Sequence, residues 1–109
     1  QTLGSQKSQI ITVGSVVIDL ALHIVTRNGE EVKLTATEFK LLAYLAANAG
    51  RVLTNQSILS HVWEPADADR VEYLRVYIRQ LRKKLEEDPD HPCIIRNEPG
   101  IGYRFLGDE

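Results

Sequence analysis

The segment from Arg70 to Glu86, RVEYLRVYIRQLRKKLE, constrains the fold most, because it predicts a long helix with two different faces. At about 100° per residue, its apolar residues fall on one arc: Val71, Leu74, Tyr77, Ile78, Leu81 and Leu85. A neighbouring arc carries Arg75, Arg79, Arg82 and Lys83, with Val76 and Gln80 between them. One interpretation is a helix that docks by its apolar face and reads a DNA major groove with the other. The alternative is a surface helix whose arginines are simply solvated.

Charge is distributed unevenly along the chain. The 109 residues carry a net charge of −2, which counts against a nucleic-acid binder. The segment from Arg70 to Glu86 nevertheless holds six basic and two acidic residues, a local charge of +4, so the remainder carries −6. This segregation favours a protein that binds a polyanion with one face and with strong salt dependence.

Composition predicts one globular domain and excludes several protein classes. The apolar share of 43% and the charged share of 26% are ordinary for a globular domain of this size. Cys93 is the only cysteine, so neither a disulfide nor a cysteine-based metal cluster can form within the chain. No apolar run is long enough for a membrane span. We therefore expect a cytoplasmic protein that has no membrane partner.

The first third of the chain predicts a small antiparallel sheet. Residues 1–9, QTLGSQKSQ, are polar and are expected to form a linker. Short β-type runs then follow at 10–13, 16–20, 22–26 and 31–34. The pair Asn28-Gly29 is a strong signal for a two-residue hairpin turn. Up to four strands are expected.

Two shorter helices are predicted between this sheet and the basic helix. The sequence Thr35-Ala36-Thr37-Glu38 is a capping-box pattern that opens a helix over 36–48, with Gly50 as its left-handed stop. After a brief extended piece at Val52-Leu53, Thr54 caps a second helix that runs through Val62.

The C-terminal part predicts a hairpin, with strands at 94–96 and 103–105 connected through residues 97–102. The fold class is therefore α+β. We expect a winged helix-turn-helix with an N-terminal four-stranded antiparallel sheet, three helices and a C-terminal β-hairpin wing.

Several motifs resemble a known family. Leu34–Leu42, Gly50–Thr54, Val62-Trp63, Ile78–Glu86 and Gly100–Arg104 are similar to the effector domain of OmpR/PhoB-type response regulators, in the same order and spacing. The resemblance runs from about Ile11 to Phe105. The segments Tyr73–Ile78 and Glu98–Arg104 more narrowly resemble the Kdp-type branch, which regulates high-affinity potassium uptake.

The resemblance implies sequence-specific binding of double-stranded DNA and transcription regulation in a two-component system. Residues 1–9 would then be the interdomain linker and residues 10–109 the winged-helix effector domain. The implied partners are direct-repeat DNA half-sites bound by a tandem dimer, RNA polymerase, and the receiver domain of the same full-length protein. No catalytic motif, cofactor or metal site is expected.

The residues expected to contact DNA form two sets. Arginine can pair with guanine, glutamine with adenine, and valine with a thymine methyl, so the base-facing set is Arg75, Val76, Arg79 and Gln80. The phosphate and wing set, partly implied by the resemblance, is Thr54, Trp63, Tyr73, Arg82, Lys83, Asn97, Gly100, Gly102, Tyr103 and Arg104.

Simpler interpretations exist for several of these residues. Thr54 is explained by its helix cap alone, and Trp63 by core packing. Tyr73 suits either the DNA backbone or the core, and Arg104 either phosphate or solvent. Pro99 stands where many relatives carry an arginine, and proline cannot bring a charge into a groove.

The acidic loop Glu64, Asp67 and Asp69 lacks the further ligands of a cation site, and the resemblance implies a polymerase contact there. A functional alternative for the whole domain is a winged helix that contacts only proteins, which the acidic net charge would suit.

Overall fold

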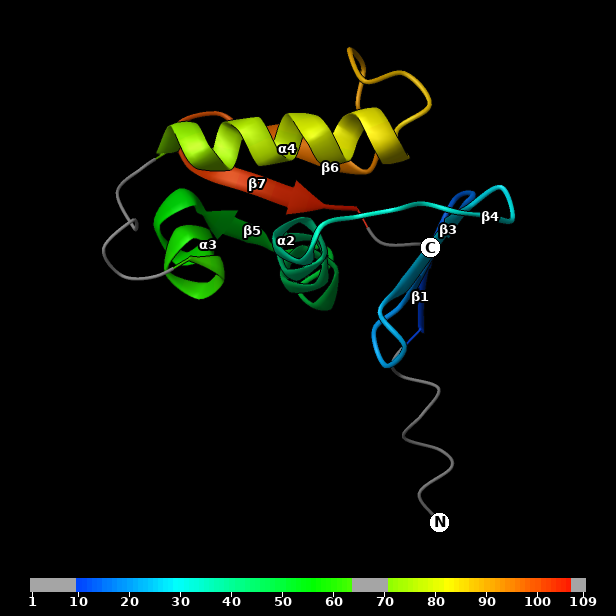
Figure 1. Cartoon of the computed structure of the whole chain (residues 1–109). Coiled ribbons are helices and arrows are strands. Elements are labelled where there is room, and N and C mark those ends of the chain that lie inside the picture. The colour runs from blue at the N-terminus through cyan, green and yellow to red at the C-terminus, as the bar shows by residue number, and fades with distance from the viewer. Residues whose placement is uncertain (1–9, 64–70, 107–109) are drawn as a thin grey trace.

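The computed structural model describes residues 10–63 and 71–106. Its elements run, in chain order, β1 (Ile10–Val13), β2 (Val16–Asp19), β3 (Ile24–Arg27), β4 (Glu30–Glu31), α2 (Ala36–Ala47), β5 (Val52–Thr54), α3 (Asn55–Val62), α4 (Val71–Leu85), β6 (Ile95–Glu98) and β7 (Gly102–Phe105). Figure 1 shows the first sheet at one end of the molecule, and α2, α3 and α4 packed together beside it. The predicted winged-helix fold class is confirmed.

The first sheet is the predicted four-stranded antiparallel meander, in the order β1-β2-β3-β4. Side chains alternate between the two faces of this sheet, and Val16, Ile18 and Val25 are buried on the face toward the core. Asn28 and Gly29 both have positive φ, 56° and 83°, as a two-residue hairpin turn requires. The prediction of a strand at 31–34 was wrong in its bounds, because β4 covers only Glu30–Glu31. The chain leaves the sheet after Val32 and leads to α2.

The predicted capping box of α2 is present. Thr35 Oγ1 accepts a hydrogen bond from the Glu38 N–H at 3.2 Å, and Glu38 Oε1 accepts one from the Thr35 N–H at 3.0 Å. Gly50 has the predicted left-handed φ of 86°, although the helix itself ends earlier, with Asn48 as its C-cap. The Gly50 N–H donates to the Phe105 carbonyl, which joins this turn to the last strand.

The second sheet has the order β5-β7-β6. The hairpin of β6 and β7 is the predicted wing, but its strands are longer than expected and only residues 99–101 connect them. The pairing of β5 with β7 was not predicted. It places the start of α3 directly beside the wing.

The core is formed by one apolar face from each helix. On α4, Leu74, Ile78, Leu81 and Leu85 are each at most 1% exposed. They pack with the buried side chains of α2, α3 and the second sheet, which include Leu41, Leu42, Leu45, Ile58, Leu59, Ile95 and Phe105. Each such side chain contributes about 1.5–3 kcal/mol through burial. This packing fixes the rotation of α4 about its own axis.

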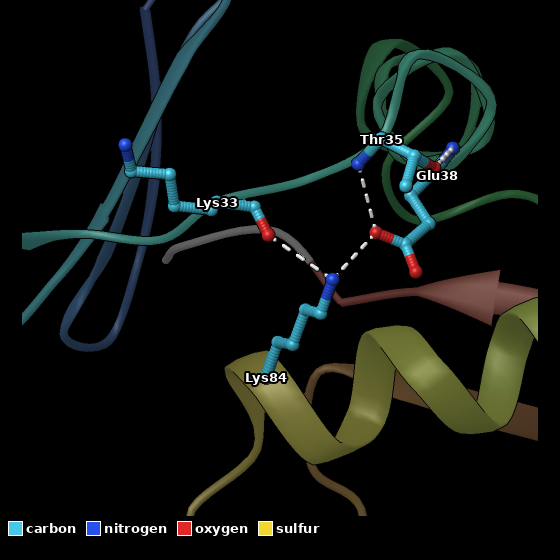
Figure 2. A network of polar contacts seen from close by, with 4 residues as sticks. All are labelled: Lys33, Thr35, Glu38 and Lys84. Carbon is cyan, nitrogen blue, oxygen red and sulfur yellow. Dashed lines mark hydrogen bonds and ion pairs between the residues drawn. The ribbon is translucent and has the colours of Figure 1, made fainter.

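A polar network also holds the C-terminal half of α4. Lys84 Nζ donates to Glu38 Oε1 at 2.7 Å and to the Lys33 carbonyl at 3.0 Å (Figure 2). Glu38 is only 5% exposed, so a buried carboxylate joins α4, the first turn of α2 and the segment that leaves the first sheet. Within the described residues no helix is both long enough and apolar enough to cross a lipid bilayer.

We expect Lys84→Met to lower the free energy of unfolding by about 1–2 kcal/mol, because it leaves the buried Glu38 carboxylate without its cation. Urea unfolding followed by circular dichroism measures this loss. A cycle with Glu38→Gln isolates the pair, and a coupling energy below about 0.5 kcal/mol would contradict the role of the network.

Candidate nucleic-acid interface

Opposite the buried side of α4 lies an exposed side, which we call the outer face. It consists of Glu72, Val76, Arg79, Gln80 and Lys83. Val76 is 50% exposed, which core packing does not explain. The outer face therefore carries three of the four residues that the sequence predicts to be base-facing.

A groove of about 740 Å³ separates α4 from the wing, and we call it the helix–wing groove. Arg75, Arg79 and Lys83 line it on the helix side, and residues 97–103 line it on the wing side. All three cations are exposed and none makes a hydrogen bond or ion pair with another described residue. The three cations thus line one concave region, to which the connection after α4 also contributes Asp90.

Arg82 has a different environment from its cationic neighbours. Its Nε and Nη2 donate to the Ile95 carbonyl at 3.2 and 2.9 Å, and Nη2 also donates to Asn97 Oδ1 at 3.0 Å. Burial lowers the pKa of the Arg82 guanidinium below its usual value, while Tyr103 and Glu86 oppose that shift. The sequence predicts a phosphate contact for Arg82, but in the structure these donors hold the base of the wing.

Two other residues that the sequence predicts to contact DNA, Arg104 and Tyr103, make their contacts within the protein. Arg104 pairs with Glu98 Oε2 through Nε and Nη2, both at 2.9 Å. Tyr103 is only 8% exposed, with the Arg82 guanidinium carbon 5.8 Å from its ring centroid. For both residues a direct DNA contact stays a prediction, and their main observed contacts shape the wing.

The tip of the wing depends on its two glycines. Gly100 has a φ of 76°, which a side chain would strain. Gly102 has no room for a Cβ, because one there would overlap the Leu53 carbonyl. The Ile101 carbonyl accepts a hydrogen bond from the Asn55 N–H at 3.0 Å, which joins the tip to the first residue of α3.

Three other residues that the sequence predicts to contact DNA do not line the helix–wing groove: Thr54, Trp63 and Tyr73. Thr54 is exposed and caps α3, since its Oγ1 accepts from the Ser57 N–H at 3.0 Å. Trp63 is half-buried and meets Tyr77 edge to face at 5.3 Å, as core packing predicts. Tyr73 is 40% exposed in the first turn of α4. The loop residues Glu64, Asp67 and Asp69 lie outside the described residues.

Sequence reasoning missed two groups in the helix–wing groove. Asn55 lines it, and its buried Oδ1 has no hydrogen-bond partner in the structure. Ile101 also lines it and is 50% exposed, a position that its place between two turn glycines could have indicated. No group of three or more His, Cys, Asp or Glu in the described residues is arranged to hold a metal ion.

Glu86 is a further residue that the sequence did not identify. It is 3% exposed, and its carboxylate accepts hydrogen bonds from the N–H groups of Cys93, Ile94 and Ile95, each at 2.8 Å. These bonds tie the end of α4 to the start of β6. Together with Arg82, Glu86 therefore sets where the wing leaves the helix.

Comparison with known proteins identifies the class of protein to which the chain belongs. Residues 29–105 match the family model described as "Transcriptional regulatory protein, C terminal", and the chain belongs to this family. DrrB of Thermotoga maritima, an OmpR/PhoB homolog, superposes with a TM-score of 0.81 at 34% identity over 97% of this chain and 48% of DrrB. The RstA DNA-binding domain of Klebsiella pneumoniae, crystallised with the RstA box, superposes with a TM-score of 0.75 at 29% identity over 90% and 97%.

Within this class the chain is similar to KdpE, the KDP operon transcriptional regulatory protein of Escherichia coli K12. The two are 46% identical over 97 residues, which is 89% of this chain and 43% of KdpE. The chain thus spans less than half the length of this relative. The predicted resemblance to OmpR/PhoB effector domains and to their Kdp-type branch is confirmed, and the family consists of transcription regulators, not enzymes.

We expect Arg82→Ala to destabilise the protein by about 1–2 kcal/mol, because the Ile95 carbonyl loses both of its Arg82 donors. Hydrogen exchange of the β6 amides should accelerate along with this loss. Lys83→Ala is the matched control, and its stability should stay within about 0.5 kcal/mol of the parent. Equal stabilities of the two variants would show that Arg82 does not hold the wing.

We expect Gly102→Ala to destabilise the protein by more than about 2 kcal/mol, because backbone atoms of β5 must move to admit a methyl group. Thermal unfolding measures the effect. Gly102 has no positive φ, so its loss reports the clash alone, whereas Gly14→Ala, at a φ of 58° with open space around it, reports backbone strain alone. A Gly102→Ala variant as stable as the parent would contradict the close approach.

Proposed function

We propose that this chain binds double-stranded DNA sequence-specifically and regulates transcription as the output domain of a two-component response regulator. One observation carries the proposal. Beside a β-hairpin, the outer face of α4 and the helix–wing groove present three exposed cations that pair with no other residue in the described part of the chain. This is the surface that a winged helix-turn-helix lays on a duplex.

In this arrangement α4 lies in the major groove. Arg75, Val76, Arg79 and Gln80 face base edges, where arginine can bind guanine through two hydrogen bonds and valine can contact a thymine methyl. Lys83 lies one turn beyond Arg79 and contacts phosphate. Thr54 is the N-cap of α3, and the positive end of that helix dipole suits a phosphate of the same backbone.

The charge distribution supports this orientation. Two of the basic side chains of α4, Arg82 and Lys84, are engaged in internal hydrogen bonds. The cations left for a polyanion are those of the outer face and the groove. Since the chain as a whole has a charge of −2, only this side should attract DNA.

The family suggests partners for the full-length protein. We propose that residues 1–9, outside the described part, link residues 10–109 to a receiver domain, and that two copies bind direct-repeat half-sites in tandem. The similarity to KdpE suggests genes for potassium transport as targets. We also propose that RNA polymerase contacts the loop that holds Glu64, Asp67 and Asp69. The proposed location of the protein is the cytoplasm.

Selection of bound fragments from a random duplex pool tests the function. We expect enrichment of a direct repeat whose half-sites are spaced by about one helical turn. Affinity for the selected duplex should fall steeply as the salt concentration rises. A domain that contacts only proteins, which the acidic net charge would also suit, should enrich nothing.

Two substitutions separate base recognition from phosphate binding. We expect Arg79→Ala to lose about 10- to 100-fold in discrimination between the selected duplex and a scrambled one. Lys83→Ala should weaken both duplexes alike and reduce the salt slope by about one. Fluorescence anisotropy titrations at several salt concentrations measure both effects.

The matched control is Lys40→Ala, which removes an exposed cation from α2, away from the groove. Its affinity and salt slope should equal those of the parent. If Arg79→Ala and Lys83→Ala behave identically on the selected and scrambled duplexes, the assigned roles are wrong.

A further inference from the structure

We propose that Glu72, the acidic residue of the outer face, accepts a hydrogen bond from the N4 amino group of a cytosine in the major groove and so determines part of the recognised sequence. This inference rests on the proposed function and deepens it, since it assigns a base preference to a side chain whose charge is opposite to that of the cations around it. Its basis is the position, the exposure and the contacts of Glu72.

Glu72 lies at the centre of the outer face, in the first turn of α4. At about 100° per residue, its direction from the helix axis lies within about 20° of those of Arg79 and Lys83. The fully buried Leu74 and Leu81 lie on the opposite side of the helix. In helix-turn-helix proteins the N-terminal part of the recognition helix contacts base edges. A duplex that contacts the two cations with α4 in its major groove therefore also lies over the Glu72 carboxylate.

The Glu72 carboxylate is exposed and makes no hydrogen bond or ion pair with any other described residue. The buried carboxylates of Glu38 and Glu86, by contrast, accept hydrogen bonds that hold the fold together. Arg75, three residues further along α4, lines the helix–wing groove and does not pair with Glu72. The acceptor oxygens of Glu72 are thus available to a bound molecule.

A carboxylate can only accept hydrogen bonds, so the duplex must offer Glu72 a donor. Phosphate oxygens are themselves acceptors with negative charge, and they repel it. In the major groove cytosine presents the N4 amino donor, whereas guanine and thymine present acceptor oxygens and the adenine amino group lies beside the N7 acceptor. Cytosine is therefore the base whose exposed edge fits a glutamate.

The same carboxylate weakens binding to unrelated DNA. Bringing its charge toward the duplex costs free energy at every sequence, and a cytosine at the right position offsets that cost. Beside Arg79 and Lys83, Glu72 therefore raises the specificity of the outer face and lowers its general affinity for DNA.

Selection from a random duplex pool, carried out with the parent chain and with two variants, tests the base preference. We expect the parent to enrich a C·G pair at one position of each half-site. Glu72→Ala should accept all four base pairs at that position while the rest of the repeat is retained. Glutamine keeps the size of the side chain and adds an amide donor, so Glu72→Gln should shift the preference there from cytosine to adenine.

Fluorescence anisotropy titrations measure the size of the effect on duplexes that differ only at this position. We expect the parent to bind the cytosine duplex about tenfold more tightly than the thymine duplex, and Glu72→Ala to bind the two equally. The matched control is Glu30→Ala, which removes an exposed carboxylate from β4, outside the helix–wing groove. It changes the net charge equally and should keep the preference of the parent.

An acidic side chain in the first turn also stabilises a helix through the helix dipole. A lower melting temperature of Glu72→Ala with an unchanged base preference would assign Glu72 to that role alone and overturn the inference. An equal loss of preference in Glu30→Ala would also overturn it, because the effect would then be one of net charge. If the parent enriches a repeat that Glu72→Ala leaves unaltered, this inference fails and the proposed function stands. If the parent enriches no duplex, both fail.

Discussion

The burial of one apolar stripe on α4 is the constraint on which the other features depend. Leu74, Ile78, Leu81 and Leu85 are almost completely excluded from solvent, so α4 has one rotational setting about its axis. That setting places the outer face opposite the core and turns Arg75 toward the wing. A rotation by one residue position would bury cations and expose leucines, at a cost of several kcal/mol. The exposure of this cationic surface is thus a consequence of hydrophobic packing.

Local patterns in the sequence predicted most of the elements. The capping box at Thr35 and Glu38, the turn at Asn28-Gly29 and the two-faced helix depend on interactions within a few residues, and all three are present. The pairing of β5 with β7 joins residues about fifty positions apart and has no such local signal. The strand β4 is also shorter than predicted, and just beyond it the Lys33 carbonyl accepts a hydrogen bond from the distant Lys84, which no local pattern indicates.

The sequence predicted which face of the helix carries the candidate site, but not the role of each cation on that face. Periodicity places Arg79 and Arg82 on the same basic arc and cannot separate them. Tertiary contacts do separate them, because Arg82 bonds to the wing backbone while Arg79 stays exposed. In the same way Lys84 is bonded to Glu38 (Figure 2) and Arg104 to Glu98. Internal hydrogen bonds and ion pairs thus separate the cations that stabilise the fold from those that stay exposed to solvent.

A nuclear magnetic resonance titration of the ¹⁵N-labelled chain with the selected duplex shows most directly whether α4 and the wing form the DNA-binding surface. We expect amide shifts to concentrate in α4, at the start of α3 and in the connection between β6 and β7, while β1 to β4 stay unchanged. Shifts confined to the first sheet, with α4 unaffected, would contradict it.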